Sequence, residues 1–200
     1  NRSKKPFSDQ NINICLVFPD VYEIGMSHQG IKLLYRLLNN LPDVNAERCF
    51  LPDIQSIPAF KEHDVALFSL ENRKSINEFD LVAFSLLSEL NFTNVLAVLD
   101  LAKIPFKSEE RKGLPIIAGG GISVINPEPL RNFIDFFAFG DGEFLFPNIV
   151  NLFLRNKKRG SDKEQLLSEL NALPGFYVPR FFPVKKDGLF FVPETKGKTI

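Results

Sequence analysis

The sequence alternates short apolar runs with segments of helical periodicity, and this alternation constrains the fold more than any other feature. Apolar runs occupy residues 12–18, 44–51, 81–86, 114–118 and 134–139. Helical periodicity separates or follows them at residues 28–40, 88–102 and 143–156. Strands of a parallel sheet that is covered on both faces consist of continuous apolar runs, and their alternation with helices is typical of βαβ units. We therefore predict an α/β fold with a doubly wound, mostly parallel, five-stranded sheet of the flavodoxin-like (Rossmann-like) type, in the order 2-1-3-4-5.

The C-terminal part of the chain differs from this pattern. A polar break at residues 156–162 ends the alternation, a short helix is expected at 163–170, and residues 177–192 predict a β-hairpin that turns near Lys186 to Gly188. We expect a flexible polar tail at residues 1–11, an α/β domain at 12–157 and a small extension at 158–200. Shorter helices are expected at 53–62 and, from capping-box spacing, at 75–78.

Composition excludes several classes of protein. Lysine plus arginine equals aspartate plus glutamate at 24 each, which argues against a broad electrostatic surface for nucleic acid or an anionic membrane. No apolar run approaches the roughly 20 residues that span a bilayer, and residues 1–10 lack the apolar stretch of a signal peptide. Cys15 and Cys49 have apolar neighbours, which predicts buried, reduced thiols and a cytoplasmic location.

Four loops follow predicted strands and carry the candidate binding residues. Open α/β sheets bind ligands outside the carboxyl ends of their strands, where the strand order reverses, so these loops should meet in one crevice. Without Cβ atoms, a glycine run lets a ligand approach the backbone closely. The candidates from the residues alone are Ser85, Gly119, Gly120, Gly121, Asn126, Gly140, Asp141, Gly142 and Glu143.

Each candidate also has a purely structural interpretation. Gly119 to Gly121 could form a tight strand-to-helix turn, Asp141 could cap the next helix, and Ser85 could bond neighbouring backbone. His28 has no second histidine or cysteine at ligand spacing, so we expect a polar first-turn residue and no metal site. The glycines do not follow the Gly-x-Gly-x-x-Gly pattern and no Walker lysine is present. No Ser–His–Asp arrangement is evident, and we expect no catalytic residue in this chain.

The same loops resemble those of a known family. The matching stretches are Phe-Pro-Asp-Val-Tyr-Glu-Ile-Gly-Met-Ser at 18–27, Phe-Ser-Leu at 84–86, Ala-Gly-Gly at 118–120, Asn-Pro-Glu-Pro-Leu at 126–130 and Gly-Asp-Gly-Glu at 140–143. Together with Leu-Pro-Gly-Phe-Tyr-Val-Pro at 173–179, they resemble the N-terminal, cobalamin-binding-like domain of an uncharacterised bacterial branch of radical S-adenosylmethionine proteins. The resemblance covers nearly the whole chain from Ile12.

This resemblance implies a cofactor and a larger protein. It implies that cobalamin lies over the strand ends, with its nucleotide tail passing Ser85, Leu86, Gly119 and Gly120, and with residues 140–143 closing the next edge. It also implies that residues 158–200 lead toward a radical S-adenosylmethionine barrel, an intramolecular partner that holds S-adenosylmethionine and a [4Fe-4S] cluster. The chain has no Cys-x-x-x-Cys-x-x-Cys motif, so we expect that cluster outside it and the chain alone to be catalytically incomplete.

One departure from the family pattern leaves alternatives open. Cobalamin mutases and methyltransferases supply a cobalt ligand from Asp-x-His-x-x-Gly, and this chain has no such motif. The cofactor would then bind without a protein histidine. Alternatively, the domain is a degenerate fold that only docks onto the barrel, its crevice plugged by Phe84, Phe92 or Phe144. A third interpretation is a flavodoxin-like domain that binds a nucleotide or flavin.

Overall fold

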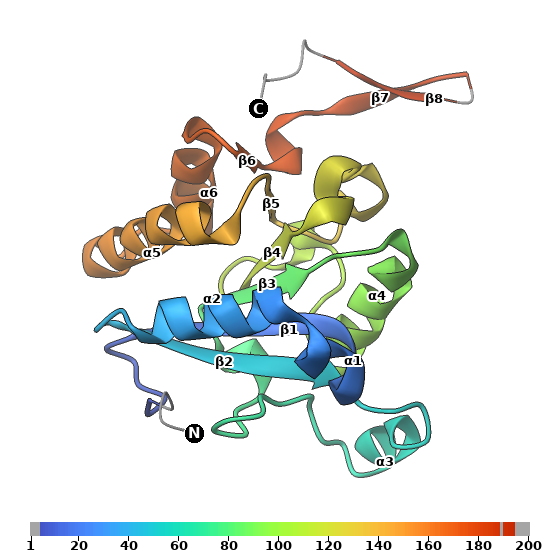
Figure 1. The fold of residues 1–200 in the computed structure, drawn as a ribbon. Coiled ribbons are helices and arrows are strands. Elements are labelled where there is room, and N and C mark those ends of the chain that lie inside the picture. The colour runs from blue at the N-terminus through green and yellow to red at the C-terminus, as the bar shows by residue number, and fades with distance from the viewer. Residues whose placement is uncertain (1–4, 189, 195–200) are drawn as a thin grey trace.

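The chain folds around one six-stranded sheet with the order β2-β1-β3-β4-β5-β6 (Figure 1). The computed structural model describes residues 5–188 and 190–194. Strands β1 to β5 are parallel, and β6 is antiparallel to β5. The six strands are β1 (Ile12–Val21), β2 (Val44–Leu51), β3 (Leu81–Ser85), β4 (Ile116–Gly120), β5 (Phe136–Ala138) and β6 (Phe176–Tyr177). The predicted order of the first five strands is confirmed, whereas the sixth strand was not predicted.

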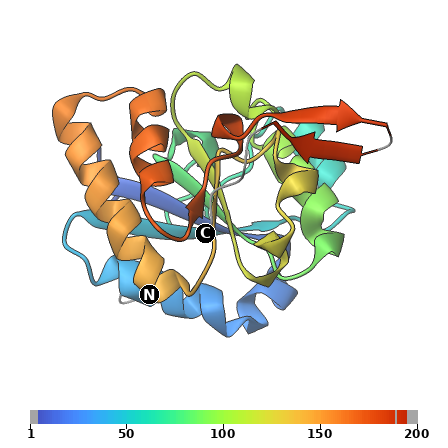
Figure 2. The same ribbon diagram turned by 90° about the horizontal axis from the view of Figure 1, so that it is seen from above.

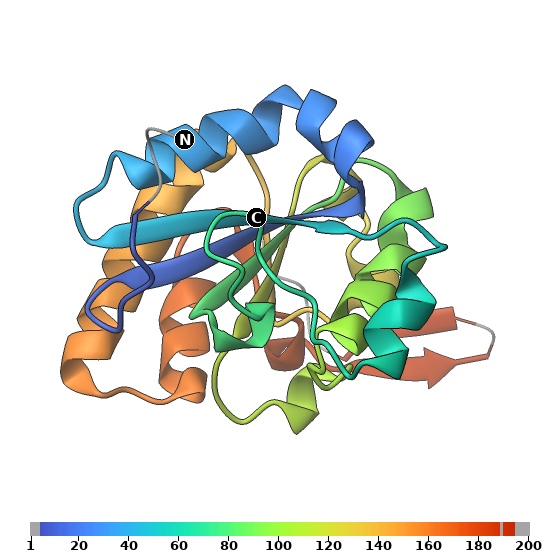
Figure 3. The ribbon, with the colours of Figure 1, turned by 90° about the horizontal axis from the view of Figure 1, so that it is seen from below.

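Helices cover both faces of the sheet, as a doubly wound fold requires. One face packs against α2 (Gln29–Asn39), α5 (Gly142–Arg159) and α6 (Lys163–Ala172), and the other against α4 (Phe92–Leu101). Figure 2 shows the α5–α6 pair and α4 on opposite sides of the sheet. Figure 3 shows α2 on one side of β1 and β2, with the segment that precedes β3 on the other side. Two separate hydrophobic clusters result, one for each face.

Short helices occupy several connections. The loop after β1, which we expected to be irregular, contains α1 (Tyr22–Ser27). The N-cap of α2 is His28, whose Nδ1 accepts the backbone N–H of Ile31 at 3.4 Å. The other short helices are α3 (Ile57–Glu62), η1 (Ile76–Glu78), η2 (Glu89–Asn91), η3 (Ser108–Glu110), η4 (Ile122–Ile125), η5 (Glu128–Leu130) and η6 (Pro179–Phe181).

Strand β4 runs two residues further than its apolar run indicates. Gly119 and Gly120 pair with β3 on one side and β5 on the other, so the neighbouring strands hold them in the ladder although glycine lowers strand propensity. The turn comes at Gly121, whose φ of 115° is a conformation that side chains with a Cβ rarely adopt. The glycine run therefore ends a strand with bare backbone before the chain turns.

The C-terminal segment contributes to both the main sheet and a separate hairpin. The predicted hairpin at residues 177–192 is wrong at its start, because Tyr177 belongs to β6. Phe176 is fully buried, and its ring packs against Phe136 with 6.0 Å between centroids, which holds β6 on the sheet. The hairpin itself consists of β7 (Val184–Asp187) and β8 (Phe190–Pro193), which are antiparallel and extend from the body (Figure 1).

A buried cluster of charges ties the C-terminal helix to the sheet. The Asp135 carboxylate is 1% exposed and accepts bonds from Lys163 Nζ at 2.8 Å and from the backbone N–H of Ile117 at 2.7 Å. Arg111 lies 3.3 Å from the same carboxylate. Burial lowers the pKa of Lys163 and of Arg111, and the Asp135 charge opposes both shifts. The cluster therefore links β4, β5, the region of η3 and α6 in one network.

The N-terminal tail packs against the body in part. Of the tail predicted at residues 1–11, residues 1–4 lie outside the described part, and Phe7 packs edge-on against Phe79 with 5.1 Å between ring centroids. In the described ranges, none of the helices has the length and apolar character needed to cross a membrane.

Candidate functional site

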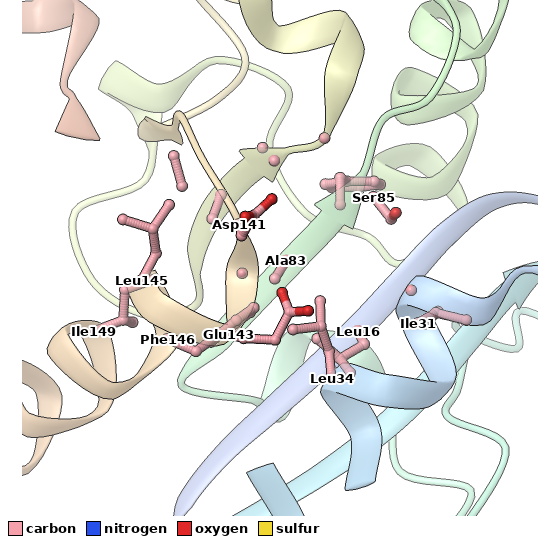
Figure 4. Close-up of a pocket in the computed structure, with 18 of the residues that line it drawn as sticks. Leu16, Ile31, Leu34, Ala83, Ser85, Asp141, Glu143, Leu145, Phe146 and Ile149 are labelled. Atoms are coloured by element: carbon pink, nitrogen blue, oxygen red, sulfur yellow. The ribbon is translucent and has the colours of Figure 1, made fainter. Parts of the chain in front are cut away.

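A cavity of about 230 Å³ opens at the carboxyl end of the sheet. It lies between the sheet face and helices α2 and α5 (Figure 4). Strands β1, β3, β4 and β5 all contribute to its lining, as do the turns that follow β4 and β5. The cavity is thus at the switch in strand order, where the loops of a doubly wound sheet were expected to meet.

The floor of the cavity consists of small side chains on adjacent strands. Ala83 pairs with Ala118, and Gly120 lies between Ser85 on β3 and Ala138 on β5. Since side chains alternate across a strand, these five residues share the face that α2 and α5 cover. Larger residues there would fill the space beneath the helices. The short side chains leave a hollow that the helices do not close.

The walls of the cavity come from the two helices. Ile31 and Leu34 of α2 face Leu145, Phe146 and Ile149 of α5 across the hollow (Figure 4). The start of α5 lies close to α2: a Cβ on Gly142 would lie 2.8 Å from the Leu34 Cδ2. Gly142 therefore lets the start of α5 approach α2 closely.

The rim of the cavity carries two carboxylates. Asp141 and Glu143 are at the first turn of α5, and the Asp141 side chain makes no capping hydrogen bond there. Figure 4 shows both on the α5 side of the cavity, with Glu143 extended toward Leu34. Among the described residues that line the cavity there is no lysine or arginine. The interior is apolar, and its polar edge has an excess of negative charge.

The structure brings together eight of the ten predicted site residues. Lining the cavity are Ser85, Gly119, Gly120, Gly121, Gly140, Asp141, Gly142 and Glu143. Leu86 lies outside the lining, because its fully buried side chain belongs to the cluster on the opposite face of the sheet. Asn126 is also outside the lining, in an exposed position just after η4.

The sequence interpretation missed the alanines of the floor and the helical walls. Ala83, Ala118 and Ala138 each stand two residues before Ser85, Gly120 and Gly140, close to a strand end. This repeated Ala-x-small pattern in three neighbouring strands was a detectable signal. The pattern is one of small side chains and not of polar ones. Glycine-rich and polar loops point only to the second residue of each pair, so the alanines were overlooked.

His28 lines one edge of the cavity and caps α2. Its Nδ1 accepts the backbone N–H of Ile31 at 3.4 Å. Its ring also packs against Phe18 with 5.5 Å between centroids. In the part of the chain that the structure describes, no group of three or more His, Cys, Asp or Glu residues could hold a metal ion.

The three phenylalanines that were considered as plugs do not fill the cavity with their rings. Phe84 is in the hydrophobic cluster on the opposite face, and Phe92 packs against that same cluster. Phe144 is 76% exposed. The hollow above the alanine floor is consequently open to a ligand.

Comparison with known proteins places the chain in a family. Residues 30–179 match the family described as "Radical SAM proteins, N-terminal". The chain belongs to this family. The matched residues include both the alanine floor and the turns of the rim. No curated protein matches the chain.

One solved structure is also similar to this radical SAM N-terminal domain. It is the radical S-adenosylmethionine methyltransferase TsrM from Kitasatospora setae, with a tryptophan substrate and a SAM analogue bound. The two share 15% sequence identity, with a TM-score of 0.49 over 91% of this chain. The chain spans 30% of the length of that protein.

Proposed function

We propose that this domain binds a cobalamin-type cofactor for a radical SAM enzyme and is not itself the site of the radical step. The observation that carries the proposal is the apolar cavity between α2, α5 and a floor of small residues at the strand ends. Such a cavity accepts a flat, largely apolar group, and the bare backbone at Gly120 and Gly121 permits close approach. Membership of the radical SAM family supports the enzymatic context.

The size of the cavity favours one part of the cofactor. Complete small-molecule sites measure about 300–1,000 Å³, and this cavity has about 230 Å³. It therefore suits a single aromatic ring system, such as the base of the nucleotide tail. The much larger corrin would lie outside, over the rim formed by the turns after β3, β4 and β5. Bound in this way, cobalamin would bring its own cobalt, and His28 would not be required as a ligand.

The surface around the cavity mouth supports a covering partner domain. Several elements at the carboxyl end of the sheet carry exposed apolar side chains: Tyr22, Ile24, Leu33, Leu90, Ile122, Ile125 and Phe144. Large exposed apolar patches mark interaction sites in soluble proteins. In the proposed arrangement the radical SAM domain, with its S-adenosylmethionine and [4Fe-4S] cluster, covers this face and encloses the cofactor between the two domains.

Two rival functions are less well supported. A docking domain without a cofactor would need a filled crevice, and the rings of Phe84, Phe92 and Phe144 lie elsewhere. A flavin or nucleotide phosphate at the rim would face Asp141 and Glu143 with no lysine or arginine in the described lining. Two unit charges about 6 Å apart repel by roughly 3 kcal/mol at an effective dielectric constant of about 20.

A binding measurement tests the proposal. Hydroxocobalamin is titrated into the protein and followed by visible absorbance and by calorimetry, with flavin mononucleotide as the competing ligand. We expect saturable binding of cobalamin and none of flavin mononucleotide. Ala83→Leu projects a larger side chain into the cavity and should weaken binding at least tenfold, a loss of about 1.4 kcal/mol. Ala59→Leu, the same change at an exposed position of α3, is the matched control. A wild-type protein that binds no cobalamin at high micromolar concentration would refute the proposal.

A further inference from the structure

A second cavity, of about 270 Å³, lies at the amino end of the sheet. It forms where the first residues of β1 and the start of β4 meet the end of α5 and the start of α6. The length of the strands separates this amino-end cavity from the one described above. An apolar cavity of about 150 Å³ already accepts benzene, so there is room here for a substituted ring. The walls are mostly apolar and include Ile12, Leu114, Ile116, Phe153 and Leu166.

One buried amide interrupts these apolar walls. Asn156 lines the amino-end cavity and is 4% exposed. The other buried residues of α5 are all apolar, so a leucine at position 156 would continue their stripe. The Asn156 Nδ2 donates to the Leu152 carbonyl oxygen at 3.0 Å. Within the ranges that the structure describes, however, the Asn156 Oδ1 has no hydrogen-bond partner. A buried acceptor costs free energy until a donor reaches it.

Asn39 of α2 shows what a structural asparagine does in this fold. Its Nδ2 donates to the carbonyl oxygen of Tyr35, four residues earlier, at 3.0 Å. It also donates to Ala46 O at 2.9 Å, while its Oδ1 accepts the Ala46 N–H at 3.1 Å. Both ends of this amide therefore tie α2 to β2. Asn156 makes the same bond within its own helix, but its oxygen makes no such second contact with the described residues.

The charged groups around the amino-end cavity have other tasks. Lys163 belongs to the buried charge cluster of the C-terminal helix, and Lys157 lies 3.5 Å from the carboxylate of Asp80. Asp162 caps α6 with its carboxylate, and Lys112 is exposed to solvent. The described lining thus offers a ligand an apolar surface and one amide oxygen, and neither feature favours a charged molecule.

We propose that the amino-end cavity binds a small neutral ligand whose apolar body fills the space and whose hydroxyl or ring N–H donates to the Asn156 Oδ1. Apolar walls with a few placed polar groups are the usual form of a small-molecule site. The site differs from the cofactor cavity in its place in the fold and in its chemistry. The inference does not depend on the proposed function, and it stands or falls whether or not cobalamin binds.

Two probes that differ in one hydrogen-bond donor test this assignment. The molecules 4-fluorophenol and 4-fluorotoluene are similar in size and shape, but only the first can donate to Asn156. Each is titrated into the protein and followed by ¹⁹F NMR. The preference for 4-fluorophenol, measured as the ratio of the two dissociation constants, should fall about fivefold in Asn156→Leu, because this change removes the acceptor and keeps the volume. Asn151→Leu, the same change at an exposed position of α5 outside the lining, should leave the ratio unchanged.

A measurement on the wild type places the ligand without any substitution. Bound 4-fluorophenol should show ¹⁹F–¹H contacts to the methyl groups of Ile12 and Leu166, and the urea midpoint verifies that each variant is folded. The inference is overturned by a wild type that binds neither probe, by a saturated complex without these contacts, or by equal ratios in the wild type and Asn156→Leu. Loss of 4-fluorophenol binding in Ala83→Leu but not in Asn156→Leu would place the ring at the other end of the sheet and overturn it as well.

Discussion

Two adjacent glycines that line the cavity should respond differently to substitution by alanine. Gly121 has φ 115° and ψ −179°, a region that is nearly restricted to glycine and costs other residues about 1–3 kcal/mol. An added Cβ would also lie 2.4 Å from the Leu86 carbonyl oxygen. That oxygen accepts the N–H of Ser123 at 3.1 Å, so moving it strains a further bond worth about 1 kcal/mol. Gly121→Ala should therefore lower the free energy of unfolding by about 3 kcal/mol or more.

Gly120 provides the matched control for this change. A Cβ at Gly120 would find Ala138 O as its nearest atom, at 3.9 Å, which is an ordinary contact. Alanine also reduces the conformational freedom of the unfolded chain, worth about 0.4–1 kcal/mol at compatible positions. Gly120→Ala should leave stability unchanged within about 0.5 kcal/mol or raise it slightly. Because its methyl group enters the cavity floor, it should still weaken cobalamin binding.

Urea unfolding followed by far-UV circular dichroism measures both variants. The free energy is taken from the midpoint and the slope, which should be common to both proteins if each unfolds in two states. Since domains are stable by about 5–15 kcal/mol, a loss of 3 kcal/mol moves the midpoint by an easily measured amount. Equal destabilisation by the two substitutions would show that the turn at Gly121 and the open floor at Gly120 are wrongly assigned.

Two further predictions concern groups outside the cavity. Asp135→Asn should destabilise the protein by about 3–5 kcal/mol, because Lys163 and Arg111 would be left buried without their counter-charge; a urea midpoint shift equivalent to less than 1 kcal/mol would contradict this. Burial and the nearby Glu128 raise the pKa of Tyr177 to about 12, so the unfolded chain loses this proton first and stability should fall from pH 10 toward pH 12. Solvent screens the half-exposed ring, so the raised pKa changes the free energy of unfolding by about 1 kcal/mol between these pH values. Tyr177→Phe should remove that part of the pH dependence, measured by urea unfolding.

The parallel sheet could be predicted from the sequence because burial on both faces makes each strand a continuous apolar run, and the order 2-1-3-4-5 was the one expected of a doubly wound, flavodoxin-like fold. Residues 81–86 and 114–118 could only be central strands, and their parallel direction brought four loops to one end. The same property is the reason that the cavity could not be predicted from the sequence. When both faces are apolar, polarity does not alternate, so nothing in the pattern of residues 81–85 distinguishes the face of Ala83 from that of Phe84. The distinction is one of size, and it has meaning only once α2 and α5 are known to cover the small side.

Local signals failed where tertiary pairing outweighed them. The glycines at 119 and 120 were expected to end β4, but hydrogen bonds from two neighbouring strands outweigh their weak propensity. Tyr177 was assigned to the hairpin, since its apolar neighbours resemble those of any short strand. Pairing with β5 and the packing of Phe176 against Phe136 place β6 on the main sheet.

The cavity lowers the free energy of unfolding, and this effect links stability to ligand binding. An empty apolar cavity lowers stability by about 24 cal/mol per Å³, so a volume of 230 Å³ sets an upper limit of about 5.5 kcal/mol, which is reduced to the extent that water enters through the mouth. A ligand that fills the space recovers part of this and raises the unfolding temperature by mass action. The larger side chain of Ala83→Leu should also fill part of the cavity and so raise the free energy of unfolding, provided that it fits without strain. Its stability should thus rise or stay level while its affinity for cobalamin falls, whereas Gly121→Ala should lower both. A variant Ala83→Leu that loses stability and affinity together would mean that the alanine floor packs against its neighbours and encloses no space for a ligand.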